Sequence, residues 1–230
     1  MKNSKIVLFL LLILSVAFAR PTLIIIDASG SMEEVMTDGT VKINAAKAAA
    51  NQIVQQATDE IALMVYTDCD YGGDPHSGSI SVVVPFTTNK AQLTAEIAKI
   101  TPMWDTPIAR SLEEGMTYVS TSGKQAGIVL LTDGEETCDD TAYATQVAGT
   151  AQQHGVVIIN IVGFQLDEYT EEDMREVAYA GGGNYYQADD VSSLTYSMQQ
   201  AYQSASGDDI YCCGSMFVLL ALAGFVVLRR

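Results

Sequence analysis

Short, uninterrupted apolar runs alternate with longer amphipathic stretches along most of this chain. The runs lie at residues 23–26, 61–66, 128–131 and 156–162. Runs of this length and composition are typical of strands that are buried on both faces of a parallel sheet. Between and after them, the pattern predicts helices at about 43–57, 91–100, 107–119, 142–153, 171–180 and 190–204.

Two further segments complete the predicted sheet. Residues 79–86 are β-branched and follow a glycine, so we expect an edge strand that pairs antiparallel with the strand ending near Tyr66. A last strand is predicted at 184–187, after the glycines at 181–183. The sequence therefore predicts an α/β fold in one domain, residues 20–206, with a doubly wound, mostly parallel six-stranded sheet, one antiparallel edge strand and helices on both faces.

The amino-terminal end of the chain resembles an export signal. Residues 1–19 contain two lysines, then the apolar stretch 6–14, and end in the small-x-small sequence Ala17-Phe18-Ala19. This order is typical of a secretory signal peptide, with cleavage expected before Arg20. The protein is therefore predicted to be exported.

The carboxyl-terminal end predicts a membrane anchor. After a short linker at 207–209, residues 210–228 are apolar apart from Cys212-Cys213-Gly214-Ser215, and Arg229-Arg230 follow as a cytoplasmic end. The segment is just long enough to span a bilayer, and the terminal arginines place the folded domain outside the cytoplasm. A processed C-terminal sorting segment is the alternative, and the role of the two cysteines is open.

The charge of the domain limits its partners. Four of the 12 basic residues lie outside residues 20–209. This segment therefore contains 8 basic residues and all 28 acidic ones, which gives it a net charge of −20. Such a surface repels phosphate backbones, and no nucleic-acid partner is expected. Solubility of an exported protein is a simpler explanation of the acidity.

Three loops carry oxygen-bearing side chains at predicted strand ends or helix starts. Asp27, Ser29 and Ser31 follow the first strand, Asp133 follows the strand 128–131, and Thr106 precedes a helix. Carboxylate and hydroxyl oxygens suit a hard divalent cation, and open α/β sheets bind ligands at the carboxyl ends of their strands. Each loop also has an ordinary explanation, because such residues are common in turns and Thr106 could be a helix N-cap.

Taken together in this order, the three loops resemble the metal-ion-dependent adhesion site of von Willebrand factor type A domains. The stretches IIIDASGSM, DTPIAR, VLLTDGEETC and GGGNYYQADD are especially similar to secreted bacterial-type members. The resemblance implies that Ser29, Ser31 and Thr106 contact Mg²⁺ through their hydroxyls, with Mn²⁺ and Ca²⁺ as alternatives. Asp27 and Asp133 would bind directly or through water, and an acidic residue of a protein ligand would complete the coordination.

Acidic residues close to these loops distinguish the chain from many relatives. Met103-Trp104-Asp105 stands before Thr106, where many relatives have a glycine. We expect the rim of the site to be strongly negative and to disfavour an anionic ligand. The acidic residues on the same loops are Glu33, Glu34, Glu135 and Glu136. Trp104 is either a contact residue at the rim or a packed side chain.

Cysteine placement predicts a cross-link near the same edge of the sheet. Cys69 follows the strand ending near Tyr66 and Cys138 follows the Asp133 loop. In an oxidising compartment these two residues are expected to form a disulfide, the alternative being two unpaired thiols.

The sequence indicates a binding module rather than an enzyme. The chain has two histidines, no G-x-S-x-G motif and no phosphate-binding glycine loop, so it offers little for nucleophilic or acid–base catalysis. We expect an adhesion-type module at the cell surface or envelope that binds a protein ligand through a metal. The alternatives are a metal-dependent phosphoesterase, with Glu135 or Glu136 as base, and a structural membrane protein that does not use the site.

Overall fold

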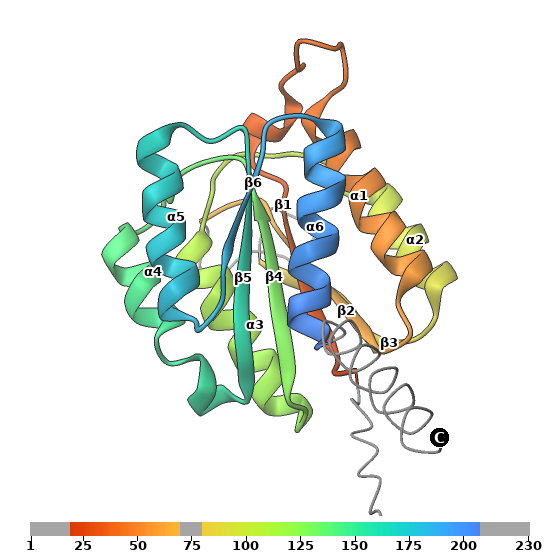
Figure 1. Cartoon of the computed structure of the whole chain (residues 1–230), viewed down its shortest axis with the longest axis vertical. Helices are drawn as coiled ribbons and strands as arrows, with labels where there is room; N and C mark the ends of the chain where they lie inside the picture. The colour runs from red at the N-terminus through yellow and green to blue at the C-terminus, as the bar shows by residue number, and fades with distance from the viewer. Residues whose placement is uncertain (1–18, 70–79, 208–230) are drawn as a thin grey trace, which may run out of the picture.

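The computed structural model describes residues 19–69 and 80–207, which form a single six-stranded sheet covered by helices on both faces (Figure 1). The strand order is β3-β2-β1-β4-β5-β6. Strands β2, β1, β4, β5 and β6 run parallel to one another, and β3 pairs antiparallel with β2 at the edge. The predicted fold class is confirmed, including the antiparallel edge strand. The strands are β1 (Thr22–Asp27), β2 (Ile61–Tyr66), β3 (Ser81–Thr87), β4 (Ala126–Thr132), β5 (Val156–Phe164) and β6 (Tyr185–Ala188).

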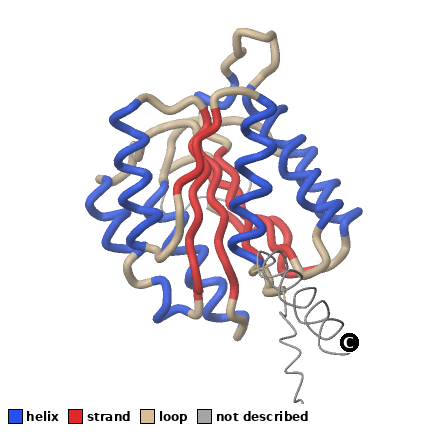
Figure 2. Tube along the Cα trace, in the orientation of Figure 1, coloured by secondary structure: helices blue, strands red, loops and turns tan. Residues whose placement is uncertain are grey.

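Three helices cover each face of the sheet, as the blue and red tubes of Figure 2 show. One layer consists of α1 (Lys42–Gln56), α2 (Lys90–Lys99) and α6 (Val191–Ser206). The other consists of α3 (Ile108–Ser122), α4 (Thr141–Ala148) and α5 (Glu168–Ala180). Two short 3₁₀ helices, η1 (Gly30–Glu33) and η2 (Ala151–His154), were not predicted from the sequence.

Strand β1 shows why its sequence is apolar throughout. Every residue of β1 is buried, and successive side chains point into the two hydrophobic cores on opposite faces of the sheet. Ile24 and Ile26 pack under α1 and α6, whereas Leu23 and Ile25 pack under the α3 layer. Because side chains alternate between the two faces of a strand, a sheet covered on both sides requires an unbroken apolar run.

Most predicted boundaries agree with the structure to within a few residues, and one helix is shorter than expected. The stretch predicted as a single helix at 142–153 is instead α4, which ends at Ala148, followed by η2. Gly149 caps α4, and glycine is among the poorest residues for continuing a helix. The prediction therefore missed a break at a glycine within an otherwise helical pattern.

The predicted signal peptide and the predicted carboxyl-terminal segment lie outside the described residues, as do Cys212 and Cys213. Within residues 19–69 and 80–207, no helix combines the length and apolar character needed to cross a bilayer. Export and membrane anchoring stay predictions.

Candidate functional site

The candidate site lies between β1 and β4, at the point where the strand order changes direction. Strands β2 and β3 lie on one side of β1, and β4, β5 and β6 lie on the other. β1 and β4 are neighbours, with Ile26 opposite Leu131 at their carboxyl ends. After β1 the chain passes to α1 on one face, and after β4 it passes to α4 on the other face. The two loops therefore diverge at this point, and open α/β sheets bind ligands at such a switch in the strand order. Asp27 ends β1 and Asp133 directly follows β4.

Asp27 is fully buried and is fixed by hydrogen bonds to both loops. Its Oδ1 accepts a hydrogen bond of 2.7 Å from the backbone N–H of Ser29. Its Oδ2 accepts one of 2.7 Å from the hydroxyl of Thr132 and a longer one of 3.3 Å from the backbone N–H of Asp133. One carboxylate thus joins the loops that follow β1 and β4.

The hydroxyls of the first loop face the carboxylate of the third. Ser29 Oγ and Ser31 Oγ lie 3.0 Å apart. Ser31 Oγ donates a hydrogen bond of 2.6 Å to Asp133 Oδ1. The 3₁₀ turn η1 starts at Gly30, between these two serines, and its buried Met32 anchors the turn in the core. Ser31 therefore lies within hydrogen-bonding distance of two other predicted ligands, Ser29 and Asp133.

Thr106 brings the second loop to the same place. A Cβ added at Gly134 would lie 3.6 Å from Thr106 Oγ1 and 3.8 Å from Ser31 Oγ, so both hydroxyls border the same small space. The expectation that Thr106 caps α3 is wrong, because the helix starts at Ile108 and its N-cap position is Pro107. The capping role falls to Glu136, whose Oε2 accepts a 2.6 Å hydrogen bond from the Ala109 N–H. The Thr106 hydroxyl therefore has no capping function.

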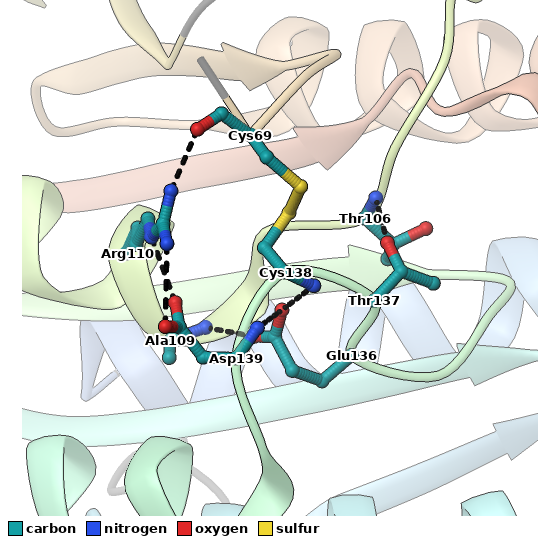
Figure 3. Close-up of a disulfide and its surroundings, with 8 residues drawn as sticks. All are labelled: Cys69, Thr106, Ala109, Arg110, Glu136, Thr137, Cys138 and Asp139. Atoms are coloured by element: carbon teal, nitrogen blue, oxygen red, sulfur yellow. Dashed lines mark hydrogen bonds and ion pairs between the residues drawn. A yellow bond between two sulfur atoms is a disulfide. The ribbon is translucent and has the colours of Figure 1, made fainter. Parts of the chain in front are cut away.

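The predicted disulfide between Cys69 and Cys138 is confirmed, with 5.5 Å between the two Cα atoms. Figure 3 shows that it joins the loop after β2 to the loop carrying Glu136 and Thr137. Thr137 and Thr106 exchange two hydrogen bonds: the Thr106 N–H donates to Thr137 Oγ1 at 2.8 Å, and the Thr137 N–H donates to the Thr106 carbonyl at 3.1 Å. The cross-linked loop therefore holds Thr106 in position.

Arg110 reinforces the same loop (Figure 3). Its Nη1 donates to the Cys69 carbonyl at 2.6 Å, and its Nε donates to Asp139 Oδ2 at 2.7 Å. Glu136 Oε1 accepts hydrogen bonds from the N–H groups of Cys138 and Asp139 at 2.8 and 3.1 Å. Glu136 thus acts as an internal structural carboxylate, and its expected contribution to a negative rim is corrected accordingly.

Sequence reasoning missed one charged residue of the site. Lys42, the first residue of α1, is only 6% exposed, and its Nζ donates to Asp133 Oδ2 at 2.9 Å and to Glu34 Oε2 at 2.6 Å. Asp133 is thus held from two sides, by an ammonium group and by the Ser31 hydroxyl. The only available signal in the sequence was a lysine at a helix start, which is usually a solvated position.

Burial controls the electrostatics of the two aspartates. Burial raises the pKa of Asp27, against the opposing effect of its hydrogen bonds with Ser29 and Thr132. Burial also raises the pKa of Asp133 to about 6, the charge of Asp27 adds to this effect, and Ser31 and Lys42 oppose it. Burial and the nearby Asp27 raise the pKa of the buried Tyr66 hydroxyl. For Lys42, burial lowers the pKa, but bonding to Glu34 and Asp133 outweighs it and the net pKa is raised.

These residues fit a divalent cation. The converging donors are all oxygens, and two buried carboxylates close enough to repel each other are offset by a single ammonium group. A hard dication would relieve that repulsion, because such ions prefer carboxylate and hydroxyl oxygens. The residues that could hold it are Asp27, Ser29, Ser31, Thr106 and Asp133.

The rim of the site combines exposed apolar and acidic side chains. Trp104, whose packing was left open by the sequence, is 73% exposed, and Val35 is 66% exposed. Asp68 and Asp105 bring carboxylate oxygens to within 4.8 Å of each other and of the Cys69 sulfur, which belongs to the disulfide and is not a thiolate ligand. The rim thus remains acidic even though Glu34 pairs with Lys42 and Glu136 binds backbone N–H groups.

A family profile described as the von Willebrand factor type A domain matches residues 22–136, half of the chain. The chain belongs to the von Willebrand factor type A domain family. The match starts at β1 and ends at Glu136, so it includes all three loops of the candidate site. The resemblance inferred from the motifs is confirmed at the level of the family.

Three of the similar proteins come from bacteria. The uncharacterized protein YwmD of Bacillus subtilis is 26% identical over 202 residues, which cover 78% of this chain and 84% of YwmD. The vWF domain of the type V pili tip protein Mfa5 from Porphyromonas gingivalis aligns with a TM-score of 0.64 at 15% identity, covering 83% of this chain and 96% of that domain. The pilus adhesin SpaC from Lactobacillus rhamnosus GG aligns with a TM-score of 0.65 at 19% identity, covering 81% of this chain but only 30% of SpaC. At these identities the two structures establish a shared fold.

Proposed function

We propose that this protein is an adhesion-type module that binds a protein ligand through a divalent metal ion, with Mg²⁺ preferred. The observation that carries the proposal is the convergence of Ser31, Thr106 and Asp133 from three separate loops on one small space beside Gly134. The hydrogen bond between Ser31 and Asp133 accounts for part of this convergence, but turn formation does not explain why oxygens from three loops border one space. A shared ligand explains it.

Each residue has a distinct role in this proposal. The hydroxyls of Ser29, Ser31 and Thr106 provide neutral ligands, and Asp27 and Asp133 provide the charge that balances a dication. When bound, the metal supplies an electrophilic centre that accepts an acidic side chain of the partner. The exposed Trp104 adjoins the loop carrying Thr106 and is suited to contact the partner, since aromatic side chains are enriched at interfaces.

The cellular setting we propose is the outside of the cell or its envelope. The disulfide supports it, because disulfides persist in oxidising compartments. The similarity to a pili tip protein and a pilus adhesin supports it as well. We further propose that the module is not an enzyme. Glu136, a candidate base, already accepts three backbone hydrogen bonds and caps α3.

Calorimetric titration of the full chain with Mg²⁺, Mn²⁺ and Ca²⁺ tests the metal site. We expect one site, abolished in Asp27→Ala and strongly weakened in Thr106→Val, which keeps the shape of threonine but removes its hydroxyl. Thr106→Ser keeps the hydroxyl and is the matched control, with metal affinity close to wild type. Equal affinities in all four proteins would refute the assignment.

Ligand binding needs a second experiment. Wild-type protein and Asp27→Ala are used to capture proteins from the native cell surface, with and without a chelator. The proposal predicts a partner that is retained only by wild-type protein with metal. Metal-dependent hydrolysis of p-nitrophenyl phosphate, lost in Asp27→Ala, would instead support the phosphoesterase alternative.

A further inference from the structure

The two oxygens of Asp133 have different partners. Oδ1 accepts the 2.6 Å hydrogen bond from Ser31, on the side of the converging hydroxyls. Oδ2 accepts the 2.9 Å hydrogen bond from the Lys42 ammonium group. The Asp133 side chain is 0% exposed and that of Lys42 is 7% exposed, so water does not compete strongly for either contact. One oxygen of Asp133 therefore faces the candidate ion position, and the other is held by a buried cation.

Local structure holds Lys42 in this place. The loop between η1 and α1 folds back on itself through an antiparallel bridge between Val35 and Val41, and the backbone N–H of Lys42 donates to the Glu34 carbonyl at 3.0 Å. The loop projects beyond the carboxyl edge of the sheet between β1 and α1 (Figure 1), and the buried Met36 anchors it in the core. The base of this loop thus fixes the ammonium group beside Asp133.

Metal ions differ in how they use a carboxylate. Ca²⁺ takes six to eight oxygen ligands and readily accepts a bidentate carboxylate, whereas Mg²⁺ requires a nearly ideal octahedron and binds carboxylates sparingly. Bidentate binding by Asp133 would bring the dication onto Oδ2, next to the Lys42 ammonium group, and repulsion between the two cations would push Lys42 toward the largely exposed Glu34 as its remaining partner. That exchange is unfavourable because buried charges need their partners.

We propose that Lys42 is a positioning residue that restricts Asp133 to one oxygen toward the metal and thereby selects Mg²⁺ over Ca²⁺. This inference rests on the proposed function, since it concerns the same metal site. Removing the ammonium group also makes the site more negative, which strengthens the attraction of both dications. Because that effect is shared, the ratio of the two affinities isolates the selectivity that Lys42 provides.

The test compares Mg²⁺ and Ca²⁺ affinities by calorimetry in the full chain and in Lys42→Met, which keeps an apolar stem of similar length. We expect wild-type protein to prefer Mg²⁺ and the ratio of affinities to shift toward Ca²⁺ by about 10- to 100-fold in the variant, the usual size of outer-shell effects. Glu34→Gln is the matched control: it removes the charge of the other partner of Lys42 but keeps the Lys42–Asp133 ion pair, so the ratio should stay as in wild type.

A structural role for Lys42 would change stability without changing the ratio. Thermal unfolding in chelator therefore accompanies each titration, and Lys42→Gln serves as a second variant if Lys42→Met does not fold. Lys42→Arg, which retains the charge, should keep most of the Mg²⁺ preference. An unchanged ratio in a folded Lys42 variant, or a wild-type protein without preference for Mg²⁺, overturns this inference and leaves the metal site in place. Absence of any metal binding by wild-type protein overturns the proposed function itself.

Discussion

Replacing both cysteines of the disulfide, Cys69→Ser with Cys138→Ser, should lower the stability of the domain by an amount that the structure allows us to calculate. The bridge closes a loop with a sequence separation of 69 residues. The loss of chain entropy on closing a loop of this length corresponds to about 4 kcal/mol at 25 °C, and native disulfides typically contribute roughly 2–4 kcal/mol. For a domain of this size each kcal/mol moves the melting midpoint by about 2–4 °C. We therefore expect the double variant to melt roughly 5–15 °C lower.

The assay is thermal unfolding followed by circular dichroism, in chelator and again with saturating Mg²⁺. Reductant added to wild-type protein should reproduce the lower midpoint, and reductant added to the double variant should change nothing. The second comparison is needed because the chain contains two other cysteines, Cys212 and Cys213. Equal midpoints for wild-type protein and the double variant would show that the bridge does not restrict the unfolded chain as argued.

The disulfide should also affect metal binding, through Thr106. The cross-linked loop contributes Thr137, which exchanges two hydrogen bonds with Thr106. In the double variant this loop is no longer attached to the loop after β2, so Thr106 is less well ordered before the metal binds. We expect weaker Mg²⁺ binding, with a smaller effect than in Thr106→Val, because the hydroxyl is still present. Weaker binding in the double variant than in Thr106→Val would contradict this argument.

Three further predictions concern other parts of the molecule. Gly127→Ala should lower the free energy of unfolding by about 1–3 kcal/mol, measured by thermal unfolding, because the new Cβ would lie 2.4 Å from the Ala205 carbonyl oxygen of α6. Gly149→Ala is the control and should change stability little, because its Cβ would lie 3.4 Å from the nearest atom. In chelator, stability should fall as pH rises from 4 to 7. The pKa of Asp133 is raised to about 6, so the folded protein binds a proton on this carboxylate more tightly than the unfolded chain does. Asp133→Asn should make stability less dependent on pH. Trp104→Ala should leave stability and Mg²⁺ affinity within about 0.5 kcal/mol of wild type yet reduce metal-dependent capture of the partner.

The architecture and the candidate site could be predicted from the sequence because both follow from strong local patterns. Buried parallel strands are continuous apolar runs, so β1, β2, β4 and β5 stand out, and the oxygen-bearing residues follow two of them. Parallel strands then align their carboxyl ends at one edge of the sheet. The positions of Asp27 and Asp133 at the ends of two such strands are therefore enough to predict that they lie close together, without knowledge of any side-chain contact.

The contacts of Lys42 and Glu136 could not be predicted, because they depend on tertiary packing. Lys42 lies 91 residues from Asp133, and its burial requires the loop between η1 and α1 to fold back on itself. Glu136 was expected at the acidic rim, but its side chain accepts hydrogen bonds from the N–H groups of Cys138 and Asp139 in its own loop and from that of Ala109, 27 residues away in the sequence. The Ala109 contact at the start of α3 depends on tertiary packing. Similarly, the sequence makes Thr106 a candidate N-cap of α3, because local sequence cannot reveal a capping group from another loop.

The ends of the described domain meet at the edge of the sheet opposite the candidate site. The backbone N–H of Arg20, just before β1, donates to the carbonyl of Ser206, the last residue of α6, at 2.8 Å. Asp27 lies at the other end of β1, so a load between a ligand at the site and either end of the domain runs the length of β1 or α6. β1 is paired on both sides, with β2 and β4, and α6 packs closely against Gly127 of β4. Such a load therefore acts in shear on many hydrogen bonds at once, which suits the adhesion-type function that we propose.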